Sequence, residues 1–176
     1  LYGVSGYGKS SLFGAGLIPA LESDGHRVTL LRRCYDDLAE WSLVADVVDA
    51  VSADWGEAGA AADDAPVPTL WEYFHERQRP WLREREPEDA DADAGTGAPD
   101  LPVLLLDQFE EIFIKGEDRA TDDAAADARA RANARDFLTQ LGDLVENRPP
   151  LALRRQLDTG SAAEKRALLR RYDFQA

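Results

Sequence analysis

The sequence predicts an α/β fold built on a parallel β-sheet, and three observations support that fold class. A glycine-rich octapeptide near the start, residues 3–10, is followed directly by an apolar helical pattern. A continuous apolar run, Val103 to Leu106, ends in Asp107, and its lack of polar alternation is typical of a strand buried on both faces of a parallel sheet. Segments with helical spacing of apolar residues alternate with the predicted strands, as in α/β domains.

The octapeptide Gly3-Val4-Ser5-Gly6-Tyr7-Gly8-Lys9-Ser10 fits the pattern of a phosphate-binding P-loop, or Walker A motif. Its three glycines allow the backbone amides to turn inward and form a concave nest for phosphate oxygens. We expect Lys9 to reach the outer phosphates, Ser10 Oγ to bind Mg²⁺, and a helix starting here to direct its N-terminal dipole at the anion. The expected nucleotide-binding residues are Gly3, Ser5, Gly6, Tyr7, Gly8, Lys9, Ser10 and Ser11. A glycine-rich turn that matches by chance is the alternative.

Length and composition limit the class of protein. The 176 residues suit a single domain with its own core, and the net charge of −14 argues against general nucleic-acid or anionic-membrane binding. Cys34 is the only cysteine, which excludes an internal disulfide and favours a cytoplasmic setting. No apolar run reaches membrane-spanning length. The chain opens two residues before the octapeptide without an initiator Met, so we expect a segment of a longer protein whose first strand is largely missing.

The first half of the chain reads as helix, strand, helix. Apolar residues predict a helix from Lys9 to Leu21 that Pro19 ends or kinks. A turn at Asp24-Gly25 precedes a predicted strand, His26 to Arg33. The next helix is predicted over Leu38 to Ser52, with Asp36 or Asp37 as its cap, and residues 53–68 are predicted to be loop.

Thr69 and Glu72 form a capping-box pattern that predicts another helix start. This helix should end near Pro80, and we interpret its stripe of Leu70, Tyr73 and Phe74 as core or interface packing. His75 is interpreted as a packed or solvated histidine. Residues 86–100 form an acidic run rich in Pro, Gly and Ala that predicts a solvated loop, and their spacing does not fit a calcium-binding loop.

The segment after residue 123 is predicted to be helical to the end of the chain, residue 176. A long helix is expected from Ala124 to Glu146, and Pro149-Pro150 should stop it. Ser161 is the expected cap of a last helix. Five arginines in this segment are interpreted as solvated helix-face residues: Arg154, Arg155, Arg166, Arg170 and Arg171.

The apolar strand that ends in Asp107 supplies what a P-loop requires next. A P-loop NTPase holds Mg²⁺ with a Walker B aspartate opposite the P-loop serine, so residues 103–107 are the candidate Walker B strand and Asp107 the candidate metal ligand. A buried strand with an unrelated terminal aspartate is the alternative. Gln108 to Lys115 should form a short helix with Phe109, Ile112 and Phe113 packed inward.

Lys9 is a candidate catalytic residue, and two glutamates after Asp107 are candidate catalytic bases. Many P-loop ATPases have a glutamate directly after the aspartate, whereas this chain has Gln108 there. Glu110 and Glu111 would return to the side of Asp107 if a helical turn begins at Gln108, and Glu110 is slightly preferred. Gln108 could instead orient the attacking water, and either glutamate could simply stabilise the N-terminus of the helix.

Taken together, two segments resemble the bacterial novel STAND NTPases, signal-transduction ATPases with numerous domains. The first is Gly3-x-Ser5-Gly6-x-Gly8-Lys9-Ser10-Ser11-Leu12, continued by residues 15–21, and the second is residues 104–113, Leu-Leu-Leu-Asp-Gln-Phe-Glu-Glu-Ile-Phe. The resemblance covers about residues 1–21 and 101–114. It implies a three-layer αβα P-loop NTPase domain similar to AAA-type ATPases, with an extra strand between the P-loop and Walker B strands. It also implies an ATP-binding switch attached to repeat arrays such as WD40 or to effector domains.

The chain departs from that family pattern in the segment after Asp107. No convincing buried strand is visible from Asp107 to Ala176, so the sheet should be incomplete and neither a sensor residue nor an arginine finger is assigned. The expected function is an ATP·Mg²⁺-binding, ATP-hydrolysing switch, and the alternative is a nucleotide-binding scaffold with little turnover. A GTPase is disfavoured because no Asn-Lys-x-Asp motif occurs, and an ABC ATPase because no Leu-Ser-Gly-Gly-Gln-like signature occurs. Nucleotide-dependent self-association remains open.

Overall fold

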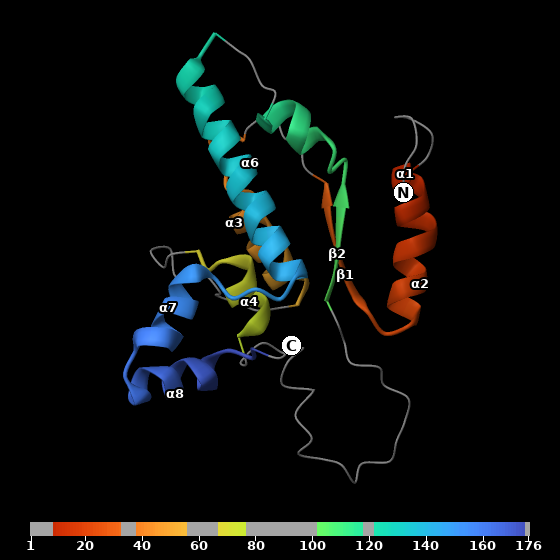
Figure 1. Cartoon of the computed structure of the whole chain (residues 1–176). Coiled ribbons are helices and arrows are strands. Elements are labelled where there is room, and N and C mark those ends of the chain that lie inside the picture. The colour runs from red at the N-terminus through yellow and green to blue at the C-terminus, as the bar shows by residue number, and fades with distance from the viewer. Residues whose placement is uncertain (1–8, 33–37, 56–66, 77–101, 118–121, 175–176) are drawn as a thin grey trace, which may run out of the picture.

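The computed structural model of the chain describes residues 9–32, 38–55, 67–76, 102–117 and 122–174 (Figure 1). The side chains of residues 9, 10 and 115–117 lie outside this description. The predicted loop at 86–100, most of the predicted loop at 53–68 and the expected caps Asp36 and Asp37 also lie outside it.

Two parallel strands form the sheet of the described residues. Strand β1 is Arg27–Arg32 and strand β2 is Pro102–Asp107. They pair in register from Arg27 opposite Pro102 to Arg32 opposite Asp107, so both strands reach their carboxyl ends at the same level. Both predicted strands are therefore confirmed, and the fold is a mixed α/β arrangement with a parallel sheet.

The helix after the glycine-rich octapeptide is longer than predicted. It consists of α1 (Lys9–Leu12), the π-helix η1 (Phe13–Leu17) and α2 (Ile18–Ser23), so of the two predicted effects of Pro19 the ending of the helix is wrong. Proline cannot donate to the helical ladder and crowds the preceding turn. Here the preceding turn is π-helical, with Ile18 N donating to Phe13 O, and the helix widens at the proline instead of ending.

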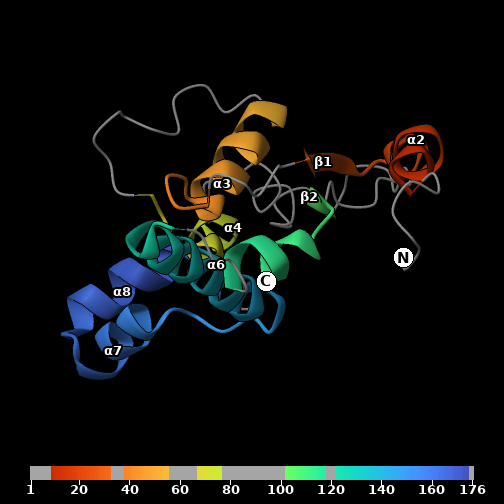
Figure 2. The same ribbon diagram turned by 90° about the horizontal axis from the view of Figure 1, so that it is seen from above.

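Helices cover both faces of the sheet. Figure 2 shows α2 on one side of the strands and α3 (Leu43–Asp54) with α6 (Ala124–Val145) on the other. Alternation along the strands matches this arrangement, because Leu31, Leu104 and Leu106 pack against the core cluster on the α3 and α6 side. On that same face Thr29 Oγ1 donates a 2.6 Å hydrogen bond to Asp54 Oδ2 of α3.

The main core lies between α3, α4 (Leu70–His75) and α6. Two fully buried alanines, Ala130 and Ala134, let α6 lie close to its neighbours. A hydrogen bond of 2.8 Å joins the buried hydroxyls of Ser52 and Tyr73. The buried members of this cluster are Leu38, Leu43, Val44, Val47, Val48, Val51, Trp55, Leu70, Tyr73, Ile112, Ala130, Ala134 and Phe137.

Helix α3 begins later than the sequence predicts. Its cap is Ser42, whose Oγ accepts a 3.3 Å hydrogen bond from Ala45 N, and the predicted start at Leu38 is wrong. The carbonyl groups of the turn before α3 accept hydrogen bonds from a side chain of α6. Asn133 Nδ2 of α6 donates to Leu38 O at 2.7 Å and to Trp41 O at 3.1 Å. These hydrogen bonds hold the segment against α6 in a non-helical conformation.

Other helix ends agree with the local sequence signals. Thr69 and Glu72 form the predicted capping box at α4, and Ser161 and Glu164 form a second one at α8 (Ala162–Arg171). Helix α6 ends in a Schellman motif: Arg148 N donates to Asp143 O at 2.7 Å, and Asn147 N donates to Leu144 O at 3.1 Å. Asn147 has φ 48, the left-handed conformation that this motif requires.

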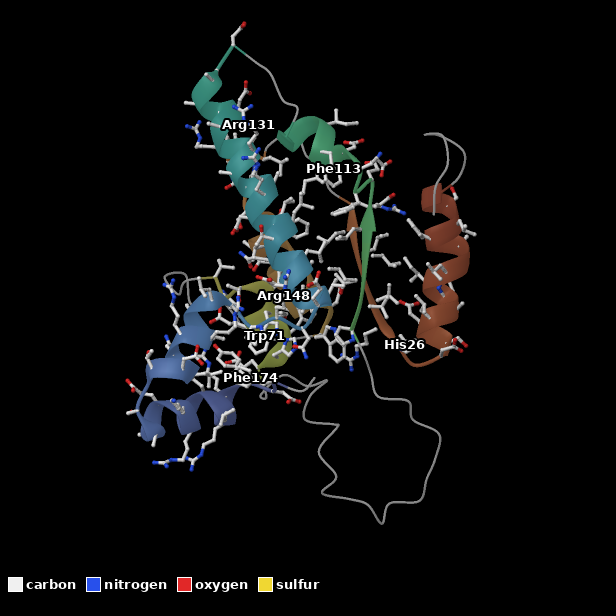
Figure 3. All side chains as sticks on the ribbon, viewed as in Figure 1. His26, Trp71, Phe113, Arg131, Arg148 and Phe174 are labelled. Carbon is white, nitrogen blue, oxygen red and sulfur yellow. The ribbon has the colours of Figure 1, made fainter. Side chains whose placement is uncertain are left out.

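A second, smaller cluster joins α4 to the end of the chain. Trp71 is 1% exposed and stacks on His75, with ring centroids 4.2 Å apart, and it lies beside Phe174 at 5.1 Å (Figure 3). Leu153 of α7 (Leu151–Thr159) and Tyr172 complete the buried part of this cluster. Helix α7 lies within the segment that was predicted to be helical, although the sequence analysis did not single it out as a separate helix.

Candidate functional site

The candidate metal ligand Asp107 is the last residue of β2, at the carboxyl end of the parallel pair. Ligands of parallel α/β sheets bind at this edge, so the placement fits the predicted role. The Asp107 side chain is 9% exposed, which is unusual for a carboxylate and indicates a built environment. Alternation along β2 directs it to the opposite face from Leu104 and Leu106, the face on which η1 and α2 lie.

Arg32 lies next to Asp107 across the strand pair. The two residues are register partners, and Arg32 Nε is 3.6 Å from Asp107 Oδ2. The arginine also reaches the helix after the octapeptide, since a methyl group on Gly14 would lie 3.9 Å from Arg32 Nη2. Sequence reasoning missed Arg32, although a charged residue at the end of a predicted strand was a signal that could have found it.

The chain turns sharply directly after Asp107. Gln108 has φ 56, a conformation that non-glycine residues rarely adopt and that clusters at functional sites. Hydrogen bonds from Glu111 N to Gln108 O at 2.9 Å and from Ile112 N to Phe109 O at 3.2 Å close a tight helical turn. The predicted turn beginning at Gln108 is thus present, and it leads into the π-helix η3 (Ile112–Glu117).

The two candidate bases differ in exposure on this turn. Glu110 is exposed and Glu111 is partly buried. Ile112 is fully buried and Phe109 packs against the core, as predicted. Phe113 is 43% exposed, so its predicted inward packing is wrong: the turn after Ile112 is π-helical and does not keep α-helical spacing.

The P-loop residues are described only in part. Gly3, Ser5, Gly6, Tyr7 and Gly8 lie outside the described residues. Lys9 and Ser10 begin α1, so the helix expected directly after the loop is present, and Ser11 is exposed. In Figure 1 the start of α1 and the carboxyl end of β2 lie at the same end of the molecule, the arrangement that a phosphate and its metal require.

The described part of the chain offers one fitting metal ligand and no complete metal-binding cluster. Among the described residues no group of three or more His, Cys, Asp or Glu side chains comes together. A single carboxylate suits Mg²⁺, which keeps several waters and is usually held by one or two protein oxygens together with substrate phosphates. Asp107 therefore fits Mg²⁺ bound with a nucleotide better than a metal held by the protein alone.

Arginines of the C-terminal helices stay away from this edge. Arg154, Arg155, Arg166 and Arg170 are exposed on α7 and α8, and Arg171 pairs with Glu76 at 3.2 Å. Their interpretation as helix-face residues is confirmed. No helix in the described ranges combines the length and the apolar character that crossing a bilayer demands.

Comparison with known proteins gives one match. A sequence model of the family described as Novel STAND NTPase 1 matches residues 1–166. Neither a curated protein nor a solved structure matches the chain. The matched range includes the octapeptide, both strands and the turn after Asp107.

Proposed function

Because the chain belongs to the novel STAND NTPase family, we propose that it is an ATP·Mg²⁺-binding module that hydrolyses ATP and acts as a signalling switch within a larger multidomain protein. The observation that carries this proposal is the position of Asp107, nearly buried at the carboxyl end of a parallel strand and followed by a strained turn. The helix that starts at Lys9 supports it, since the glycine-rich pattern directly precedes that helix.

The phosphates are bound by the octapeptide in this proposal. Backbone amides of Gly3, Ser5, Gly6, Tyr7, Gly8, Lys9, Ser10 and Ser11 surround the oxygens, and the Lys9 ammonium neutralises the outer phosphates. The positive end of the α1–η1–α2 helix adds to the attraction. Phosphate binding requires no basic surface elsewhere, which is consistent with a net charge of −14.

Ser10 and Asp107 hold the Mg²⁺ that accompanies the nucleotide. Bound Mg²⁺ would neutralise charge that develops on the phosphate oxygens. The protein positions its ligands from two separate elements, the start of α1 and the end of β2. Pairing of β2 with β1 along its whole length fixes the backbone at Asp107, and the Asp107 side chain is only 9% exposed.

Glu110 or Glu111 activates the attacking water. Both come after the Gln108 turn, and hydrogen bonds from Glu111 N to Gln108 O and from Phe113 N to Glu110 O hold them on a short helical turn beside Asp107. Glu110 is preferred because it is exposed and can accept a proton from water at the sheet edge. Gln108 is the alternative water-orienting residue.

We propose that the edge of β2 that faces away from β1 pairs with the extra strand implied by the family, which gives a three-layer P-loop fold. Nucleotide state would then reposition attached repeat or effector domains, WD40 arrays among the candidates, and nucleotide-dependent self-association is compatible with such a switch.

Single-turnover release of γ-phosphate tests the enzymatic part. We expect release from the wild-type protein with Mg²⁺, and a loss of at least about 100-fold in Glu110→Gln or Glu111→Gln, the usual contribution of a general base. Glu22→Gln removes the same charge from an exposed position of α2 and should leave release unchanged. Release at background in the wild type, with ATP still bound, would favour the alternative of a nucleotide-binding scaffold. Competition of ATP with GTP decides the base preference.

A further inference from the structure

Arg32 faces the candidate site from a strand that carries no motif. Thr29 and Leu31 of β1 face the core on the α3 and α6 side, so alternation directs Arg32 to the opposite face. Its register partner Asp107 is directed to the same face for the same reason. The 3.9 Å approach of Arg32 Nη2 to the position of a Gly14 methyl group agrees with this orientation. The guanidinium therefore lies between β2 and the helix that begins at Lys9.

Arg32 and Asp107 form an ion pair whose partners differ in exposure. The Nε atom of Arg32 lies 3.6 Å from Oδ2 of Asp107. The two partners differ greatly in exposure, 56% for the Arg32 side chain and 9% for Asp107. The solvent therefore already hydrates much of the Arg32 side chain, whereas the carboxylate is desolvated and is stabilised by a positive charge nearby.

A nearly buried carboxylate that binds a metal must be stable both with the metal and without it. With Mg²⁺ present its charge is neutralised by the metal, and without Mg²⁺ the charge remains. The Arg32 guanidinium, with Nε 3.6 Å from Asp107 Oδ2, stabilises the carboxylate when Mg²⁺ is absent. It disfavours Mg²⁺ binding, because it repels a divalent cation at the same carboxylate.

We propose that Arg32 is a resident counter-cation of Asp107 that competes with Mg²⁺ and so sets how strongly nucleotide binding depends on the metal. This inference rests on the proposed function, in which Asp107 binds Mg²⁺ together with ATP. Arg32 is a positioning residue here: it acts through Asp107 and takes no part in the chemical step.

The measurement is the metal dependence of ATP binding. A fluorescent ATP analogue is titrated into the protein once with Mg²⁺ and once with EDTA, and the ratio of the Kd in EDTA to the Kd in Mg²⁺ gives the coupling between metal and nucleotide. Arg32→Gln removes the charge and keeps a polar side chain, while Arg32→Lys keeps the charge. Arg166→Gln removes the same charge from an exposed site on α8 and is the matched control. Circular dichroism verifies that each variant is folded.

We expect Arg32→Gln to raise the ratio about three- to fivefold, the upper part of the range for an ion pair with an exposed partner. Arg32→Lys and Arg166→Gln should stay within about twofold of the wild type. In an Asp107→Asn background the effect of Arg32→Gln should disappear, because the shared partner is gone.

Two results would overturn the inference, and both differ from failure of the proposed function. A lower ratio in Arg32→Gln would mean that Arg32 only orients Asp107 for the metal. An unchanged ratio with both Kd values raised alike would mean that Arg32 contacts the phosphates directly. An unchanged ratio with neither Kd altered would mean that Arg32 plays no part. If the wild-type protein binds no ATP under either condition, the proposed function itself fails, and the wild type alone reveals this.

Discussion

A hydrogen bond between Trp71 and Asn147 joins α4 to the end of α6, and we expect it to stabilise the packing of these two helices. Trp71 Nε1 donates to Asn147 Oδ1 at 3.0 Å, and the indole is 1% exposed. The perturbation is Asn147→Gly, which removes the acceptor and still allows the backbone its φ of 48. The loss then reports the hydrogen bond and the flexibility of glycine, without strain in the left-handed turn.

The expected loss in the free energy of unfolding of Asn147→Gly is the sum of these two contributions. A buried donor left without its partner costs about 1–3 kcal/mol, and the greater freedom of glycine in the unfolded chain adds about 0.5–1 kcal/mol. In a Trp71→Phe background no donor remains, so Asn147→Gly should cost only the second amount. The coupling of about 1–3 kcal/mol corresponds to roughly 0.5–1.5 M urea at an m-value of about 2 kcal/mol/M.

Urea unfolding monitored by far-UV circular dichroism measures all four proteins of this double-mutant cycle. Tryptophan fluorescence is unsuitable, because Trp71 is itself replaced. Asn147→Asp keeps an acceptor and tolerates the left-handed backbone, so it should lose much less stability than Asn147→Gly. If Asn147→Gly costs the same free energy in both backgrounds, the hydrogen bond does not stabilise this packing and the reasoning is refuted.

Three further outcomes are expected from the packing and the titration of named side chains. Ile112→Ala should lower the free energy of unfolding by about 2–5 kcal/mol in urea, because the side chain is fully buried. Ile114→Ala, at a position 62% exposed in the same π-helix, should be nearly neutral. Equal losses would contradict the orientation of η3. Thr69→Ala should cost about 1 kcal/mol by removing the α4 capping box, and no measurable loss would count against that box as a stabilising feature. Burial, reinforced by Glu72, raises the pKa of Tyr172 above 10.0, so its contribution is complete below pH 10 and is lost as pH rises through the raised pKa. The urea midpoint should therefore fall more steeply above pH 10 in the wild type than in Tyr172→Phe, and parallel curves would exclude this contribution.

Elements encoded by neighbouring residues were predictable from the sequence. The capping boxes at Thr69 and Ser161 each need only a residue three positions away, and the strand before Asp107 is marked by its own apolar run. The turn after Asp107 was also expected, because its candidate bases require it.

Features set by distant partners were not predictable. Helix α3 starts after Ser42 because Asn133, far along the chain, binds the carbonyls of Leu38 and Trp41. The pairing of Arg32 with Asp107 depends on the register of two strands separated by much of the chain, and no local pattern specifies that register. Phe113 was misplaced because a π-helical turn has no simple periodic signature in the sequence.

The two π-helices have a consequence for how the chain tolerates changes in length. Helix η1 lies within the first of the two segments that resemble the family, and η3 begins at the end of the second. In each of them hydrogen bonds from residue i to residue i−5 replace the i→i−4 bonds of an α-helix. Such a turn contains an additional residue, equivalent to an insertion that the helix has absorbed. Deleting one residue inside Phe13–Leu17 would therefore restore α-helical bonding and leave the rest of that helix facing the same way relative to its start. In a regular α-helix the same deletion would rotate the following residues by about 100°. These turns are therefore the places where a single-residue deletion keeps the helix continuous and keeps the same flanking side chains facing the sheet.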